Sequence, residues 1–202
     1  MHQASIDRVD VPPGRTATVV TSLEMLVARA LRDERRGLEL HLRRKPAPEL
    51  AWYRELFARI GGEWLWFSRL QMEDGILRGL LENPSIEIYT LEDASGTVGL
   101  LELDFRVPGE CELSFFGLVA ERVGHGAGRF LMNRAIEIAW SRPIRRFWVH
   151  TCTHDHPAAL RFYIRSGFRP FHQYVEIFDD PRIRGPLPPG AASHVPLIAA
   201  SS

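Results

Sequence analysis

The sequence is short of cysteine, carries no surplus of either charge and contains no long apolar run. Cys111 and Cys152 are its only cysteines, too few for a disulfide framework, so we expect reduced thiols. Lysine plus arginine and aspartate plus glutamate number 25 each, and this balance argues against a nucleic-acid or membrane partner. The first residues lack the apolar segment of a signal peptide, and no later run is long enough to span a membrane. We therefore expect a globular protein of the cytoplasm.

Hydrophobic residues make up 45% of the 202 residues, enough for a real core, and their spacing predicts where strands and helices lie. Alternation of apolar and polar residues, with turn signals between the runs, predicts strands over 38–46, 86–93, 97–106, 110–121, 145–152 and 168–178. Apolar residues at three- and four-residue steps predict helices over 49–60, 72–81, from 127 to before Pro143, and from near His156 to Gly167. The order of these elements predicts a mixed α/β sheet with helices packed on it.

By composition the chain divides into three parts. Residues 36–180 hold the predicted elements and form one domain. Residues 1–35 form an N-terminal extension, in which the β-branched stretch 16–27 predicts an extra strand that pairs with a sheet edge of its own chain or of a partner. The second arrangement would make a homodimer. Residues 181–202 form a tail rich in proline and glycine.

A glycine-rich loop, "VGHGAGRFLM" over 123–132, joins a predicted strand to a predicted helix. The first N–H groups of a helix lack partners and the helix dipole is positive at that end, so such a loop can bind an anion. A turn that only lets helix and strand pack closely is the other interpretation. A Rossmann fingerprint requires a glycine where Arg129 stands, and a Walker loop requires a G-K-[ST] that is absent. Both nucleotide-loop interpretations are weakened, and nucleotide phosphoryl transfer with them.

The loop and its neighbours together resemble the GNAT superfamily of acetyl-CoA-dependent N-acetyltransferases. Val123-x-x-Gly126-x-Gly128 is similar to the superfamily's pyrophosphate loop, [Q/R]-x-x-G-x-[G/A], with Val123 in place of the glutamine or arginine. "FFGLVAE" resembles its fourth strand, "RFLMNRAIEIAW" the helix that follows, and "HPAALRFYIRSGF" its C-terminal helix, with His156 in place of an asparagine. The resemblance covers about 38–180 and is specific across 110–170. It implies a mixed, mainly antiparallel sheet of six to seven strands, flanked by helices and splayed between the fourth and fifth strands.

The resemblance also implies which residues hold acetyl-CoA as the co-substrate. Main-chain N–H groups near Leu118 and Val119 are expected to hold the thioester oxygen and the pantetheine arm. The other expected contacts come from the loop and the C-terminal helix: Val123, Gly124, His125, Gly126, Ala127, Gly128, Arg129, His156 and Tyr163. Because Val123 offers no polar group, Arg122 or Arg129 is expected to assist the phosphates.

Tyr163 stands where the superfamily's general acid stands. Its reference pKa of ~10 is close enough to the ~8.5 of a thiol for a nearly balanced proton exchange with the departing thiolate. A tyrosine packed between helix and sheet, beside Phe162, is the alternative interpretation.

Glu112 matches the position of the catalytic glutamate in the histone-acetylating branch of the superfamily, six residues before Leu118. Several nearby carboxylates are rivals for the role of general base, and an ordinary surface carboxylate is the other interpretation. The rivals are Glu102, Asp104 and Glu110. Alternation places Glu110, Glu112 and Ser114 on one face, provided that no bulge intervenes.

Four residues of "HTCTHDH" stand two apart, and imidazole and thiolate both bind zinc. They are His150, Cys152, His154 and His156. Pro157 implies that the strand has already ended at His156, which breaks the common face, and the usual zinc spacings are absent. We therefore expect no metal.

The stretch "EWLWFSRLQMED" over 63–74 brings Trp64, Trp66 and Arg69 to the region that covers the acceptor site in the superfamily. An aromatic wall with an arginine suits an acceptor with an apolar body and a carboxylate or other anion. Ordinary core packing is the alternative.

The predicted activity is transfer of an acetyl group from acetyl-CoA to a primary amine of a small molecule or a peptide, by direct attack in a ternary complex. The alternative is a non-catalytic acyl-CoA-binding or interaction module on the same fold. The replacements at Val123 and His156 favour that alternative, and the sequence does not identify the amine.

Overall fold

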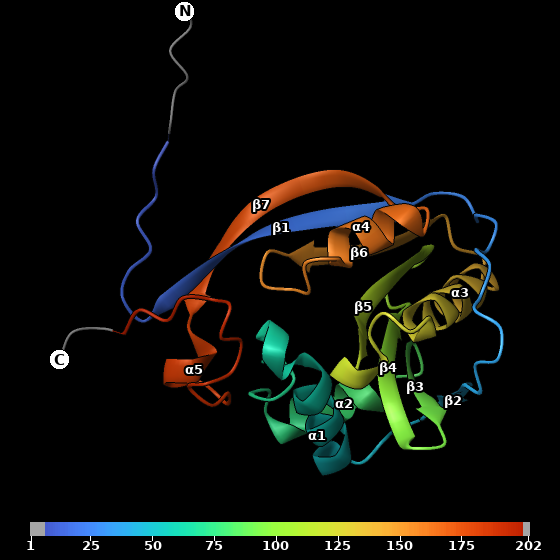
Figure 1. Ribbon diagram of the computed structural model, residues 1–202, viewed down its shortest axis with the longest axis horizontal. Coiled ribbons are helices and arrows are strands. Elements are labelled where there is room, and N and C mark those ends of the chain that lie inside the picture. Colours follow the sequence, from blue (N-terminus) through green and yellow to red (C-terminus); the bar gives the residue numbers. More distant parts are fainter. Residues whose placement is uncertain (1–6, 200–202) are drawn as a thin grey trace, which may run out of the picture.

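The computed structural model describes residues 7–199, whose seven strands form one sheet in the order β2-β3-β4-β5-β6-β1-β7 (Figure 1). The strands are β1 (Arg15–Met25), β2 (His41–Arg44), β3 (Ile86–Asp93), β4 (Gly96–Asp104), β5 (Glu110–Leu118), β6 (Arg146–Cys152) and β7 (Arg169–Asp179). The helices are α1 (Leu50–Gly61), α2 (Asp74–Leu81), α3 (Ala127–Trp140), α4 (Ala159–Arg165) and α5 (Pro181–Arg184), with 3₁₀ turns η1 (Gly62–Trp64) and η2 (Ala120–Arg122). All neighbouring strands are antiparallel except β5 and β6. The predicted mixed, mainly antiparallel sheet is confirmed.

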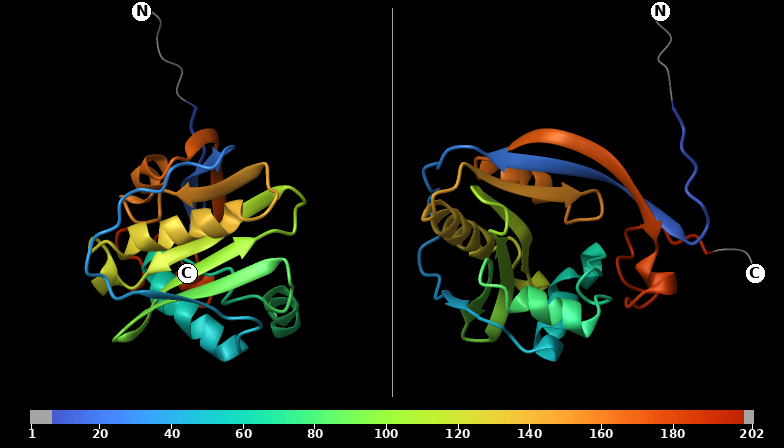
Figure 2. Two further views of the ribbon diagram at one scale, coloured as in Figure 1. Left: turned by 90° about the vertical axis from the view of Figure 1, so that its right-hand side faces the viewer. Right: turned by 180° about the vertical axis from the view of Figure 1, so that it is seen from behind.

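Strands β5 and β6 separate soon after they meet. Their parallel register holds only Glu110 with Arg146, Cys111 with Phe147, and Glu112 with Trp148. Beyond these pairs β5 continues to Leu118 and β6 to Cys152, and the two strands diverge (Figure 2). β5 and β6 correspond to the fourth and fifth predicted strands, 110–121 and 145–152. The predicted splay between these two strands is therefore confirmed.

Helices cover both faces of the sheet, and the alternation of side chains along the strands divides the core into two parts. Leu101 and Phe147 pack with Leu131 of α3 in one cluster. Leu100, one position earlier on β4, belongs to a second cluster with Phe57 of α1. Because successive side chains of a strand point to opposite faces, the sheet separates α3 and α4 from α1 and α2.

The N-terminal strand β1 lies inside the sheet. It pairs antiparallel with β6 from Val20 to Met25 and with β7 from Arg15 to Glu24. Its β-branched residues suit such a position. The expected pairing with a sheet edge is thereby corrected: β1 occupies the place between β6 and β7, and β7 holds the edge (Figure 1).

The chain between β1 and β2 crosses α3. Asn133 Nδ2 donates to the main-chain oxygen of Arg32 at 2.8 Å, and Arg134 Nη2 lies 2.6 Å from Glu34 Oε1. Asn133 is buried in α3, so this contact fixes the crossing segment. Part of the predicted N-terminal extension therefore lies against the helix that follows the glycine loop.

The Pro/Gly-rich tail is folded over its described part, residues 181–199. The buried Arg182 pairs with Asp180 at 2.7 Å and donates to the main-chain oxygens of Ala192 and Val195 at 3.2 and 2.8 Å. Val195 and Ala192 pack with Leu65 in a third apolar cluster. One buried guanidinium thus holds a segment that composition alone describes as a tail.

Some predicted boundaries change. The strand predicted over 38–46 contains only the four residues of β2, and the strand predicted over 110–121 ends just before η2. Helix α4 begins at Ala159 rather than near His156, whose Nδ1 accepts the N–H of Ala158 at 3.0 Å. Within the described chain no helix has the length and apolar character needed to cross a membrane.

Candidate active site

A cavity of about 1120 Å³ lies where β5 and β6 diverge. We define its loop end by Gly124, Gly126, Gly128, Arg32, Arg129 and Arg165, and its aromatic end by Trp64, Trp66, Phe67, Phe115, Phe178, Asp155 and Glu176. The predicted site residues that line the cavity are Trp64, Trp66, Leu118, Val123, Gly124, Gly126, Gly128, Arg129, His156 and Tyr163. Those that do not line it are Arg69, Glu112, Val119, His125 and Ala127.

The loop end places free main-chain donors at the start of a helix. Gly124 and Gly126 have φ angles of +81° and +97°, in the left-handed region that favours glycine. Helix α3 follows at once, and no acceptor within residues 7–199 faces the N–H groups of Ala127, Gly128 or Arg129. These donors and the positive end of the helix dipole suit a phosphate.

Three arginines stand beside these donors. Arg129 donates to Ser166 Oγ at 3.3 Å, and its guanidinium lies 5.3 Å from the ring centroid of Phe162. Burial and then the charges of Arg32 and Arg165 lower the pKa of Arg129. No carboxylate of the described chain pairs with any of the three. The loop end therefore carries an uncompensated positive charge.

Arg122 was, with Arg129, one of the two arginines expected to assist the phosphates, but it does not contribute to that charge. Its Nε lies 2.6 Å from Asp93 Oδ2, so it is engaged with the end of β3. Sequence reasoning missed Arg32 and Arg165. Arg165 stands in the "RFYIRSGF" segment and offered a usable signal, whereas Arg32 is remote from the loop in sequence and offered none.

Strand β5 presents main-chain groups to the gap. The N–H of Val119 donates to Val98 O at 3.0 Å, so it is not free to hold a thioester oxygen. Main-chain groups alternate between the two sides of an antiparallel strand, so those of Leu118 and Phe116 face away from β4. Both residues line the cavity. The available donors are therefore those of Phe116 and Leu118, and Phe116 was not predicted.

Tyr163 lies in the wall between the two ends. Its side chain is 7% exposed, and its ring contacts those of Phe116 and Phe168, with centroids 6.3 and 6.1 Å apart. Burial, and then the charge of Asp155, raise the pKa of Tyr163 well above its ordinary value. The hydroxyl therefore keeps its proton, but the exchange with a thiol is not nearly balanced as the reference values imply. The tyrosine is packed between helix and sheet and also lines the cavity.

Glu112 is the carboxylate without a strong cationic partner. Arg106 pairs with Asp104 at 2.6 Å, and Arg146 lies 3.4 Å from Glu110. Burial first, then the charges of Asp104 and Glu102, raise the pKa of Glu112 to about 7. A group with this pKa exchanges protons readily near neutral pH.

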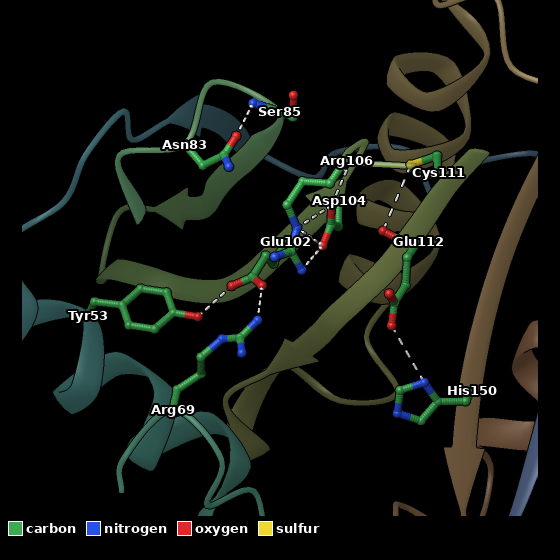
Figure 3. Close-up of polar contacts among 10 residues, drawn as sticks. All are labelled: Tyr53, Arg69, Asn83, Ser85, Glu102, Asp104, Arg106, Cys111, Glu112 and His150. Carbon is green, nitrogen blue, oxygen red and sulfur yellow. Dashed lines mark hydrogen bonds and ion pairs between the residues drawn. The ribbon is translucent and has the colours of Figure 1, made fainter. Parts of the chain in front are cut away.

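His150 connects Glu112 with the cavity. Its Nδ1 lies 3.7 Å from Glu112 Oε1 across the splayed strands (Figure 3). His150 lines the large cavity, while Glu112 lines a smaller one of about 170 Å³ that includes Trp148. A bulge leaves Ser114 without a partner on β4, so the simple alternation from Glu112 to Ser114 does not hold.

The arginine of the predicted acceptor wall is engaged elsewhere. Arg69 Nη2 lies 2.6 Å from Glu102 Oε1, and Tyr53 Oη donates to the other carboxylate oxygen at 2.5 Å (Figure 3). Glu102 is completely buried, so its charge neutralises Arg69. The two tryptophans do line the cavity, but the expected pairing of Arg69 with an acceptor carboxylate is not available.

The residues of "HTCTHDH" scatter. His150 approaches Glu112, the ring of the buried His154 packs edge-on to Phe178, and His156 packs against Trp64. Among residues 7–199, no three histidine, cysteine, aspartate or glutamate side chains gather as metal ligands.

Comparisons with known proteins agree with this fold. The sequence profile of the Acetyltransferase (GNAT) family matches residues 41–168, whereas no curated protein is detectably similar in sequence. A GCN5-related N-acetyltransferase from Sphaerobacter thermophilus is 13% identical, with a TM-score of 0.58 over 81% of this chain and 52% of its own. A conserved protein of unknown function from Staphylococcus epidermidis is 15% identical, with a TM-score of 0.56 over 83% and 64%.

An IAA acetyltransferase from Bacillus cereus is 18% identical, with a TM-score of 0.52 over 66% of this chain and 79% of its own. At such identities the structural likeness shows the fold alone, and the chain spans only 52% and 64% of the first two proteins. The profile match covers well over half of the chain and includes the glycine loop and all of α4. The chain belongs to the Acetyltransferase (GNAT) family.

Proposed function

We propose that this protein transfers the acetyl group of acetyl-CoA to a primary amine, by direct attack in a ternary complex. One observation carries the proposal: a single cavity in the splayed sheet joins an anion-binding loop end to Tyr163 and the aromatic end. Family membership and the acetyltransferase names of several fold neighbours support it.

The loop end suits the phosphates of coenzyme A. Within residues 7–199 the N–H groups at the start of α3 have no main-chain acceptor, and the guanidinium groups of Arg32, Arg129 and Arg165 have no carboxylate partner. Phosphate oxygens satisfy both needs through charge-assisted hydrogen bonds. The pantetheine arm then follows the gap along β5, with the main-chain groups of Phe116 and Leu118 as partners.

Transfer requires a neutral amine. We assign its proton to the pair formed by His150 and Glu112, because His150 faces the cavity and Glu112 has a pKa raised to about 7. The nitrogen attacks the thioester carbon, a C–N bond forms, and the N–H of Phe116 stabilises the developing oxyanion. The C–S bond then breaks, and Tyr163 passes a proton to the departing thiolate while it takes up the proton that the attacking nitrogen releases, so that its hydroxyl ends protonated. The products are an amide and coenzyme A.

The proposal is tested by thiol release from acetyl-CoA in the presence of 2-phenylethylamine, putrescine or a lysine-containing peptide. We expect amine-dependent thiol release with at least one of them, and mass spectrometry should find the amine with one added acetyl group. Calorimetric binding of acetyl-CoA without thiol release from any amine would contradict it, and would instead support the non-catalytic binding module.

A further inference from the structure

The aromatic end of the cavity carries two carboxylates that form no ion pair with a basic side chain of residues 7–199. Asp155 and Glu176 both line it. Arg69, the nearest predicted cation, is neutralised by the buried Glu102. Arg182, near the same end, is neutralised by Asp180. The charges of Arg69 and Arg182 are therefore neutralised within the protein. The two carboxylates of the aromatic end have no such partner among the described residues.

Asp155 is held in place by neutral donors alone. Its Oδ2 accepts hydrogen bonds from Thr151 Oγ1 at 2.7 Å and from the N–H of Cys152 at 2.9 Å. Its Oδ1 accepts from Trp66 Nε1 at 3.4 Å. These bonds orient the carboxylate but leave its charge intact, and that charge contributes to the raised pKa of Tyr163.

Glu176, an exposed residue of β7, also lines the cavity. It pairs with Thr18 across β1 and β7, and Thr18 also lines the cavity. Phe178, two positions along the strand and hence on the same face, lies against Phe67 with ring centroids 5.3 Å apart. Within residues 7–199 no basic side chain pairs with Glu176.

Aromatic side chains, Trp66 and Phe115 among them, line the same end of the cavity. The ring of Trp66 lies 5.1 Å from that of Phe115 and 5.4 Å from that of Phe57, centroid to centroid. Such walls bind apolar or aromatic bodies and stabilise nearby cations. This end of the cavity thus combines an aromatic lining with two carboxylates.

The folded tail packs against one residue of the aromatic end, Trp64. The ring of His194 lies 5.5 Å from that of Trp64, and its Nε2 lies 3.0 Å from the main-chain oxygen of His154. Since Arg182 fixes this segment, the tail packs firmly behind Trp64. A cavity of about 1120 Å³ that also receives a pantetheine arm then leaves room for a small molecule.

We propose that the acceptor is a small primary amine with an apolar or aromatic body and no carboxylate, bound as the ammonium ion between Asp155 and Glu176. This inference rests on the proposed acetyl transfer. The carboxylates attract the ammonium group and repel an acceptor that carries an anion of its own. The sequence alone predicts the reverse, an acceptor anion held by Arg69.

The test compares 2-phenylethylamine with phenylalanine, which differs from it by one carboxylate group. For the wild-type protein we expect kcat/KM to be at least ~30-fold higher for 2-phenylethylamine, since a like charge is placed beside two unpaired carboxylates. Glu176→Gln should reduce this ratio roughly fivefold, and Glu176→Arg should reduce it further. Glu82→Gln, an exposed carboxylate at the end of α2, is the matched control and should leave the ratio unchanged.

Equal efficiency with the two amines would overturn the inference and leave acetyl transfer standing. A ratio that Glu176→Arg does not change would also overturn the assigned role of Glu176. No thiol release from any amine, with acetyl-CoA bound, would overturn the proposed function as well. The calorimetric titration of acetyl-CoA therefore separates the two failures.

Discussion

The two ends of the cavity differ in charge and in how the chain builds them. Among the residues that the structure describes, the loop end holds three arginines without a paired carboxylate, and the aromatic end holds two carboxylates without a paired cation. Elsewhere buried charges are paired, as in Arg69 with Glu102 and Arg182 with Asp180. Arg32, Arg165 and Glu176 are exposed, and Arg129 and Asp155 are half-buried. All five charges are therefore accessible to a ligand, and the contrast identifies the places where ligand charge of the opposite sign is expected.

The ends also differ in sequence range. The loop end is mostly local: the glycine loop, the start of α3 and the end of α4 supply it. The aromatic end combines the segment after α1, the turn after β6 and the edge strand β7. Substitutions at one end should therefore affect the cofactor alone, and substitutions at the other end the acceptor alone.

The largest effect is expected from the double change Arg129→Glu and Arg165→Glu. Acetyl-CoA affinity should fall roughly 1,000-fold, because charge-assisted hydrogen bonds contribute roughly 1.5–3 kcal/mol each. Calorimetry measures the Kd of acetyl-CoA for the wild-type protein and the variant. Arg161→Glu, exposed on α4 and away from the cavity, is the control and should change Kd less than about twofold. An equal loss of acetyl-CoA affinity in Arg161→Glu would mean that long-range charge alone causes the effect. It would contradict the assignment of the phosphates to the loop end.

Tyr163→Phe acts at the junction of the two ends. We expect kcat to fall roughly 100-fold through loss of the proton donor, while the Kd for acetyl-CoA stays unchanged. Stopped-flow thiol release with calorimetry separates the two quantities. Tyr89→Phe, outside the cavity, should leave both unchanged. Wild-type turnover in Tyr163→Phe would remove the tyrosine from the mechanism.

Glu112→Gln should produce a smaller loss that depends on pH. With a pKa raised to about 7, Glu112 is protonated and inactive as a base in acid, so wild-type kcat/KM should fall below pH 7. The variant should lose this acid limb and be roughly tenfold slower at pH 8. A limb near pH 7 that persists in Glu112→Gln but disappears in His150→Gln would assign it to the histidine.

The same substitution has a consequence for stability. The folded protein binds a proton on Glu112 more tightly than the unfolded chain, since its pKa rises from 4.5 to about 7. Its favourable contribution is therefore complete below pH 4.5 and is lost as pH rises through 7. Glu112→Gln should stabilise the protein by roughly 1–3 kcal/mol at pH 8, and hardly at pH 5. Denaturant titrations at the two pH values measure this difference.

The smallest effect is expected at Val123, where the superfamily pattern has a glutamine or an arginine. Val123→Arg adds a cation at an exposed position of the loop end. We expect acetyl-CoA to bind two- to fivefold tighter at low salt, and less so at high salt. Ile76→Arg, on the exposed face of α2, provides the control. Weaker binding in Val123→Arg would place the phosphates elsewhere.

Local periodicity predicted most elements between 49 and 167, and the contiguous glycine loop and Tyr163 segment predicted the cofactor end. The place of β1 was missed because its partners, β6 and β7, lie more than a hundred residues away. The folded tail was missed because it depends on the buried pair of Arg182 with Asp180. Amino-acid composition shows neither the strand pairing of β1 nor this buried ion pair.

At the site too, the contacts between segments distant in the sequence could not be predicted. Arg69 was assigned to the acceptor because the sequence does not show that Glu102, on another element, neutralises it. The available donor of Phe116, in place of Val119, depends on the pairing of β5 with β4. Asp155 and Glu176 carry no motif, and only their position on the cavity wall reveals them.

The most direct test compares the binding of acetyl-CoA with that of S-acetylpantetheine, which has the same thioester arm but no nucleotide or pyrophosphate. We predict that acetyl-CoA binds at least ~100-fold tighter to the wild-type protein, since phosphate contacts at the loop end supply much of the affinity. The variant with Arg129→Glu and Arg165→Glu should lose most of this preference. Equal affinity of the wild-type protein for both thioesters would contradict the assignment of the loop end to coenzyme A phosphates.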